Sequence, residues 1–205
     1  FASLMKPSDT IVIGCGGVGA AALYHLAKSG KRVLGLDRFL PGHALGSSHG
    51  DTRVIRLSYM EHPDYVPLLR RAYTLWEELQ AKAGRKLYHE VGLLQVGPSD
   101  GHVVPGALSS ARLHGLDLEE LAPAAARARF PGLNVPEGQR AVFERRAGYL
   151  DVEDCVRAHA DLAVQAGAEL EIGPAVRSWR QVGSGVEVVT ERSTYHAGSV
   201  VIAAG

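Results

Sequence analysis

The stretch that decides the fold runs Thr10-Ile11-Val12-Ile13-Gly14-Cys15-Gly16-Gly17-Val18-Gly19. Its β-branched start predicts a short strand, and the alanine- and leucine-rich residues 18–29 predict a helix that stops at Gly30. The glycine cluster therefore forms a turn between a strand and a helix. Such a turn lets backbone N–H groups at the helix N-terminus approach a pyrophosphate with no side chain in the way.

A second apolar run, residues 32–37, follows this helix and ends at Asp37. It is short enough to be a buried parallel strand, so the sequence predicts a complete βαβ unit. Asp37 lies about twenty residues beyond the glycines, where an acid can accept hydrogen bonds from ribose and disfavour a 2′-phosphate. A glycine motif alone is weak evidence, and Asp37 alone could be a solvated strand end. The agreement of strand, turn, helix and acid indicates dinucleotide binding.

Composition sets the class of protein. The 205 residues are 46% hydrophobic and 21% charged, which is typical of a soluble protein with one or two domains. Twenty-two basic and 22 acidic residues give a net charge of zero, so we expect no nucleic-acid or membrane partner. The sequence shows no secretory pattern and no apolar run of the roughly 18 residues that span a bilayer. With two widely separated cysteines, these features predict a cytoplasmic location.

The rest of the chain alternates between the two periodicities. Helices are predicted at residues 66–81, 108–114 and 152–166, the last stopped by Gly167. Strands are predicted at residues 92–96, 169–172, 176–181, 186–190 and 199–203, with turns at Phe130-Pro131-Gly132 and Gly183-Ser184-Gly185. Residues 91–149 are less regular, and we interpret them as an inserted region.

One further segment is not expected from a nicotinamide-binding fingerprint. It runs Gly46-Ser47-Ser48-His49-Gly50-Asp51-Thr52-Arg53-Val54-Ile55-Arg56. With Asp37 and the helix at residues 66–79, it resembles the family of monomeric sarcosine oxidase, N-methyltryptophan oxidase and pipecolate oxidase. The resemblance covers nearly the whole chain and is strongest over residues 10–80. Residues 200–205 look like the strand and turn by which those flavoproteins return to the dinucleotide sheet.

The resemblance implies an α/β fold, in which an FAD-binding, Rossmann-like βαβ sheet domain is interleaved with the start of a substrate domain. Residues 1–88 and 151–205 would belong to the FAD-binding domain and residues 89–150 to the substrate domain. The implied reaction oxidises the C–N bond of a secondary amino acid, with FAD as cofactor and oxygen as acceptor. Family members carry a flavin-linking cysteine, a lysine and further substrate ligands in their second half. These would follow Gly205, so we expect no turnover from these 205 residues alone.

The resemblance also assigns roles to individual residues. The pyrophosphate turn would comprise Gly14, Gly16, Gly17, Val18 and Gly19, with Asp37 and Arg38 at the ribose. The loop that faces the flavin would contribute Ser47, Ser48, His49 and Arg53, of which His49 and Arg53 are the candidate catalytic residues. Arg56 would bind the substrate carboxylate, Val176 would meet adenine through its backbone, and Ala204 and Gly205 would complete the cofactor site.

The chemistry of the two arginines agrees with these roles. A guanidinium matches a carboxylate bidentately and stabilises negative charge on a reduced flavin. Because Arg53 and Arg56 are three residues apart, we expect them to point in neighbouring directions on a helical or turn segment. The alternative is a pair of solvated arginines bound to Asp51 or Glu61.

Other assignments stay open. His49 could be a plain hydrogen-bonding residue, and Cys15 is interpreted as the small residue that a tight turn needs. His43, His49 and His62 lack metal-ligand spacing, so no metal site is predicted. The alternative functions are a glycine or D-amino acid oxidase-like flavoenzyme, a non-catalytic dinucleotide-binding fragment and, least favoured by the histidine and arginine segment, a nicotinamide dehydrogenase.

Overall fold

The fold comes from a computed structural model, which describes residues 8–205. Two compact units make up the chain. The first contains residues 8–52 together with Lys82–Leu87 and Asp151–Gly205, and the second contains Arg53–Ala81 and Tyr88–Leu150. Among the described residues, no helix combines the length and apolar character needed to cross a membrane.

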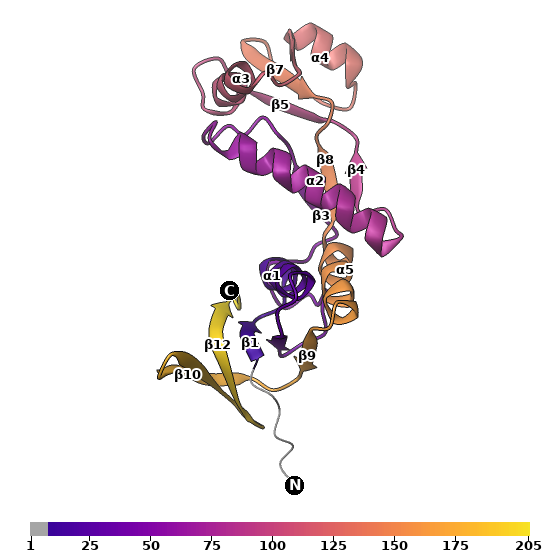
Figure 1. The fold of residues 1–205 in the computed structure, drawn as a ribbon. Coiled ribbons are helices and arrows are strands. Elements are labelled where there is room, and N and C mark those ends of the chain that lie inside the picture. The colour runs from indigo at the N-terminus through magenta and orange to yellow at the C-terminus, as the bar shows by residue number, and fades with distance from the viewer. Residues whose placement is uncertain (1–7) are drawn as a thin grey trace. The chain divides into compact units, whose positions relative to one another are not determined.

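The first unit is built on a six-stranded sheet with the order β10-β11-β12-β1-β2-β9. Strands β12, β1, β2 and β9 run parallel, whereas β10, β11 and β12 form an antiparallel meander beside β1 (Figure 1). The bounds are β1 (Ser8–Ile13), β2 (Val33–Asp37), β9 (Glu169–Ile172), β10 (Val176–Val182), β11 (Gly185–Thr190) and β12 (Thr194–Ile202).

Two helices, α1 (Gly17–Lys28) and α5 (Val152–Gln165), pack against each other in this unit. α1 also contacts β1 and β2, and α5 contacts β9. Because a parallel strand is buried on both faces, the buried ends of the two strands, residues 11–13 of β1 and 33–36 of β2, carry no polar side chain. Their side chains Ile11, Leu34 and Leu36 form one buried cluster with Val188 and Tyr195 of the meander.

The second unit contains two three-stranded sheets, β3-β8-β4 and β5-β7-β6. α3 packs on β5 and β7, where Val104 and Leu108 bury against Val142. The bounds are β3 (Thr52–Ile55), β4 (Tyr88–Glu90), β5 (Leu93–Pro98), β6 (Leu118–Leu121), β7 (Gln139–Glu144), β8 (Gly148–Asp151), α2 (Tyr65–Ala83), α3 (Val103–His114) and α4 (Pro123–Arg129).

The predicted elements of the first unit are present, including the return of the last strand to β1, although β12 begins at Thr194 rather than Ser199. The turn at residues 183–185 is confirmed as a hairpin in which Val182 pairs with Gly185. The hydrogen bond from Leu133 N to Phe130 O, 2.9 Å, confirms the turn at residues 130–132. These elements carry strong local signals, which explains why the sequence identified them.

Two expectations are corrected. Residues 91–149 are regular, because β6, α4, β7 and most of β8 lie there, and α3 begins at Val103 rather than Leu108. The segment that carries Arg53 is a strand, β3, and not a helix or turn. β6 reads Leu-Glu-Glu-Leu and α4 reads Pro-Ala-Ala-Ala-Arg-Ala-Arg, so neither shows the apolar period of its own structure.

The compact units differ from the predicted segments at Arg53–Ala81 and at Tyr88. Arg53–Ala81 groups with the second unit, although the sequence placed it with the FAD-binding segment. The reason is pairing and packing: β3 pairs with β8, and the Tyr73 hydroxyl of α2 donates to the Arg146 carbonyl at 3.1 Å. Neither partner lies near this stretch in sequence.

Candidate functional site

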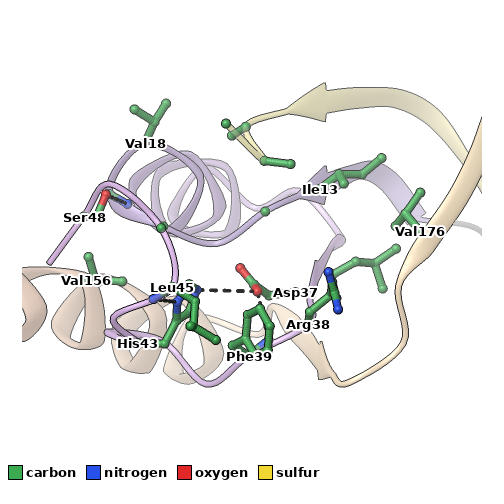
Figure 2. A pocket seen from close by; sticks show the side chains of 18 of the residues that line it. Ile13, Val18, Asp37, Arg38, Phe39, His43, Leu45, Ser48, Val156 and Val176 are labelled. Atoms are coloured by element: carbon green, nitrogen blue, oxygen red, sulfur yellow. Dashed lines mark hydrogen bonds and ion pairs between the residues drawn. The ribbon is translucent and has the colours of Figure 1, made fainter.

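A cavity of about 1020 Å³ opens at the carboxyl ends of β1 and β2 in the first unit (Figure 2). In an open parallel sheet, ligands bind at this edge because the strand ends and helix N-termini converge there. The lining comes from five stretches of the first unit, namely the end of β1 with the start of α1, the end of β2 with the loop after it, α5, residues 174–177, and residues 203–205.

The three glycines of the motif have different roles in this turn. Gly14 adopts a φ of +85°, and a Cβ atom there would lie 2.5 Å from the Cα of Ala204. A Cβ atom at Gly19 would lie 1.7 Å from the Gly14 carbonyl oxygen. At Gly16 the nearest atom to an added Cβ would be Ser48 Oγ at 3.5 Å, an ordinary contact. Gly14 and Gly19 therefore permit close packing of the chain, whereas Gly16 keeps space for a ligand.

The start of α1 lines the cavity and carries no acidic side chain in its first turn. The Gly17 N–H donates to Ser48 Oγ at 3.0 Å, and Gly16 provides no side-chain cap. Because no acidic side chain in the first turn neutralises it, the partial positive charge of the helix N-terminus is available to an anion such as a pyrophosphate. Ser48 and Val18 both lie at this helix start (Figure 2).

Asp37, at the end of β2, has a fixed carboxylate. Its Oδ2 accepts a hydrogen bond from Cys15 N at 2.6 Å, and its Oδ1 accepts one from Phe39 N at 3.0 Å. An ionised carboxylate has about four acceptor positions. The two bonds from the backbone N–H groups of Cys15 and Phe39 therefore leave acceptor positions for ribose hydroxyls. The side chain is 11% exposed and lines the cavity.

His43 is a cavity residue that the sequence reasoning missed. Its Nδ1 accepts a hydrogen bond from Leu45 N at 3.0 Å, so the proton of the neutral ring resides on Nε2. That Nε2 lies 3.9 Å from Asp37 Oδ1, and Figure 2 shows the ring turned toward the carboxylate. No periodicity or motif marks a lone histidine in a glycine-rich loop, so only the folded loop identifies it.

The two cysteines next to the site are buried and have free thiols. Burial, with a smaller contribution from the negative charge of Asp37, raises the pKa of the Cys15 thiol to about 12. Burial likewise raises the pKa of Cys155 to about 12. Neither thiol is ionised near neutral pH, so the interpretation of Cys15 as a packing residue is supported. Within residues 8–205, no group of three or more His, Cys, Asp or Glu side chains is arranged to hold a metal ion.

The structure brings most of the predicted cofactor residues to one cavity. Those that line it are Gly14, Gly16, Gly17, Val18, Asp37, Arg38, Ser47, Ser48, Val176, Ala204 and Gly205. Gly19 is buried within α1, at the contact with Gly14. His49 is exposed in the first unit and is not among the residues that line the cavity.

The two candidate arginines belong to the second unit. Arg53 is exposed on β3, and Arg56 follows the end of that strand. Side chains alternate along a strand, so the predicted reason for a shared direction, a helical or turn spacing, does not apply.

Arg56 makes local contacts. Its Nη2 lies 3.3 Å from Glu61 Oε1, so the ion pair considered as the alternative is present. Its guanidinium carbon lies 4.7 Å from the centre of the Tyr59 ring. Its Nε is buried and has no hydrogen-bond partner among the described residues. The guanidinium is thus oriented but retains an unused donor.

Known proteins with similar sequences are flavin-dependent oxidoreductases, in agreement with a dinucleotide-binding cavity. Residues 9–205 match the protein family described as FAD dependent oxidoreductase. The chain is 45% identical to monomeric sarcosine oxidase of Streptomyces avermitilis over 98% of this chain and 53% of that protein. It is 38% identical to N-methyl-L-tryptophan oxidase of Yersinia pestis over 96% of this chain and 53% of that protein.

Solved structures give the same picture. NikD, an amino acid oxidase essential for nikkomycin biosynthesis, superposes with a TM-score of 0.84 at 31% identity, covering 98% of this chain and 52% of that one. Glycine oxidase from Geobacillus kaustophilus superposes with a TM-score of 0.81 at 25% identity, covering 98% and 56%. The predicted family, α/β fold and FAD cofactor are confirmed. The chain spans about half the length of these relatives.

Proposed function

The chain belongs to the FAD dependent oxidoreductase family, and from this premise we propose that the complete protein oxidises secondary amino acids. The C–N bond of an N-methyl or cyclic amino acid would become an imine, which water hydrolyses, while oxygen takes up the two electrons and two protons as hydrogen peroxide. The identity to monomeric sarcosine oxidase and N-methyl-L-tryptophan oxidase is the observation that carries this proposal.

The residues of the cavity fit FAD. The open side of Gly16 and the first turn of α1 suit the pyrophosphate, and the spare acceptors of Asp37 suit the adenosine ribose. Val176, at the start of β10, lines the same cavity and is proposed to meet adenine through its backbone. When bound, FAD supplies the acceptor for the hydride that leaves the substrate carbon.

The substrate is proposed to bind through Arg56. A secondary amine must present one carbon to a flat ring at near contact, and a carboxylate anchor fixes that orientation. The Arg56 fork restrains rotation as well as position, and its Nε is free to donate. Tyr59 supports the guanidinium from one side, and the Glu61 side chain, 47% exposed, can give way to a substrate carboxylate.

Arg53 and His49 are proposed to act at the flavin. The Arg53 guanidinium would stabilise the negative charge that the ring gains on reduction. His49 would donate a hydrogen bond from its exposed position in the loop before β3. Both roles come from the family resemblance and stay proposals.

Oxidation of carboxylate and non-carboxylate amines tests the function. We expect the complete protein to consume oxygen and release peroxide with sarcosine, N-methyltryptophan or pipecolate. Arg56→Met should lower kcat/KM for these substrates by on the order of 30-fold or more, since removing one partner of a buried charge pair costs about 2–5 kcal/mol. Arg56→Lys should lose less.

Control variants distinguish loss of carboxylate binding by Arg56 from a general loss of enzyme function. Arg53→Met should shift the flavin spectrum or potential without substrate, whereas Arg56→Met should leave both unchanged. Equal loss on carboxylate and non-carboxylate amines, or no loss, would show that Arg56 does not anchor the substrate and only pairs with Glu61. A colourless purified protein would favour a non-catalytic fragment, and turnover of glycine without turnover of N-methyl amino acids would favour a glycine oxidase-like enzyme, which the similarity to glycine oxidase keeps as the second candidate.

A further inference from the structure

A carboxylate is buried beside the segment that follows Arg56 in the second unit. Glu144, the last residue of β7, is 2% exposed. It accepts hydrogen bonds from Leu57 N at 2.7 Å and Ser58 N at 2.9 Å, and a third from the Ser58 hydroxyl. Gln95 Nε2 donates to Ser58 Oγ at 3.0 Å and closes the network. Ser58, Gln95 and Glu144 are buried, and the whole network lies within one unit.

The Glu144 carboxylate contributes orientation rather than charge pairing to this network. Among residues 8–205, none of the donors to Glu144 is a basic side chain, so no ion pair within this part of the chain offsets the cost of burying its charge. An apolar side chain of similar size would fill the same space without that cost. What a carboxylate adds is two acceptor oxygens at a fixed spacing, which here bind two successive backbone N–H groups. The orientation of the peptides at residues 57 and 58 is therefore specified by Glu144.

The neighbouring residues of the segment are also immobilised. Ser110 Oγ, on α3, donates to the Tyr59 carbonyl at 2.6 Å. A Cβ atom at Gly106 of α3 would lie 2.3 Å from the Met60 carbonyl oxygen, so helix and segment pack backbone to backbone. On the other side of Arg56, Ile55 is 7% exposed at the end of β3.

These contacts hold the backbone on both sides of Arg56 in place. Its Cα lies between the buried Ile55 and the peptide that Glu144 binds, and its guanidinium lies over Tyr59, which Ser110 secures. We propose that Glu144 is a positioning residue for the substrate carboxylate: it fixes the backbone after Arg56 and so sets the direction of the guanidinium. This inference rests on the proposed role of Arg56 as the anchor.

The expected effect follows from geometry. Glu144→Gln keeps the size of the side chain and one acceptor oxygen but directs an amide NH₂ toward the second backbone N–H. Because misplacement of a positioning group by 1 Å can cost on the order of a hundredfold, we expect a partial displacement to cost about tenfold in carboxylate affinity. Ser58→Ala removes only the hydroxyl and keeps both backbone bonds, so its effect should be two- to threefold at most.

The test compares acetate with acetamide as ligands of the complete, FAD-loaded protein, by spectral titration. These two probes have nearly the same size, and only acetate carries a charge. We expect Glu144→Gln to weaken acetate about tenfold and to leave acetamide unchanged. The matched control is Val135→Ala, which loosens a fully buried core site in the same unit without touching the segment. This control variant should leave the ratio of acetate affinity to acetamide affinity at its wild-type value.

Hydrogen exchange gives a second readout that does not depend on the flavin. Glu144→Gln should speed exchange of the Leu57 and Ser58 amides, and Val135→Ala should not. If Arg56→Met removes the preference for acetate while Glu144→Gln keeps it, the positioning role is overturned and the anchor stands. If the wild-type protein does not prefer acetate, the anchor fails and the inference with it. If Glu144→Gln does not fold, Glu144→Asp replaces it, because aspartate keeps the charge on a shorter side chain. The ratio of acetate affinity to acetamide affinity then tests the positioning role in the same way.

Discussion

Asp37 in the first unit and Glu144 in the second are both carboxylates at strand ends that accept two backbone N–H groups. They differ in what remains available. Asp37 is 11% exposed and lines a large cavity, so its free acceptor positions can meet a ligand. Glu144 is 2% exposed and takes the Ser58 hydroxyl as well. The same chemistry therefore leaves acceptors open to a ligand in one unit and binds chain to chain in the other.

The two units also differ in how their sites are built. The cavity of the first unit depends on backbone, namely three glycines and a helix N-terminus above an apolar core. The segment around Arg56 depends on side chains that are distant in sequence, Glu144, Gln95 and Ser110. We expect substitution of Gly14 or Gly19 to distort the turn of the first unit, and substitution of Glu144 to displace the segment after Arg56 in the second.

The largest effect should come from Gly19→Ala. The added methyl group would overlap the Gly14 carbonyl oxygen, 1.7 Å away, so α1 or the turn must move. We expect a loss of at least about 3 kcal/mol in the free energy of unfolding, at the upper end for overpacking. Hydrogen exchange should show lost protection in β1 and β2 and retained protection in β5 and β7. Equal loss in all four strands would show that the units do not respond separately.

Acid should weaken the first unit through His159 of α5. Burial lowers the pKa of this histidine from 6.5 to about 4, with a smaller lowering from His25 of α1; the bond of its Nδ1 to the Cys155 carbonyl, 2.9 Å, acts against this. The unfolded chain therefore binds the extra proton first as pH falls. Stability is full above pH 6.5 and declines toward pH 4, by about 3 kcal/mol in total.

The check is urea unfolding of the wild-type chain and His159→Gln at pH 7 and pH 4.5. Tyr24 and His25 on α1 pack near this ring, and the variant keeps them unchanged. We expect the difference between the two pH values to be smaller in the variant, because carboxylates contribute equally to both proteins. An identical pH dependence would mean that His159 titrates normally in the fold.

Gly16→Val separates binding from folding in the turn. Among residues 8–205, an added Cβ at Gly16 meets only the Ser48 side chain, with Oγ nearest at 3.5 Å, so the fold should tolerate it. The branched side chain would instead occupy the space for the pyrophosphate, and we expect FAD affinity to fall at least about a hundredfold, or 2.7 kcal/mol. Titration with FAD and a thermal melt measure the two quantities. Unchanged affinity in a folded variant would remove the glycine turn from the argument.

The smallest expected effect is that of Asp37→Asn. An amide that turns its oxygen toward Cys15 N must present its NH₂ to Phe39 N, which loses one of the two bonds that orient the side chain. We expect FAD to bind about tenfold more weakly, and the discrimination against a 2′-phosphate to fall because the negative charge is gone. Competition between FAD and NADP measures both. Tight NADP binding by the wild-type protein would contradict the assignment of Asp37.

Much of the first unit was predictable because its signals are local. The β-branched run before Gly14, the glycines of the turn and the acid at Asp37 follow one another within one βαβ unit, and each constrains a neighbouring part of the backbone. The histidine and arginine segment identified the family for the same reason. Local conformational demands and a contiguous motif can be interpreted from a single sequence.

The second unit and the details of both sites depended on the tertiary structure. Glu144 binds Ser58 across 86 positions, and nothing near either residue indicates the pairing. His43 turns toward Asp37 only because the loop folds its Nδ1 onto Leu45 N. Fold class, cofactor class and the glycine turn were therefore determined by the sequence itself. Which side chains bind the segment after Arg56 and which lie beside Asp37 in the cavity was decided by the tertiary structure, because hydrogen bonds between distant segments leave no periodic or contiguous pattern in the chain.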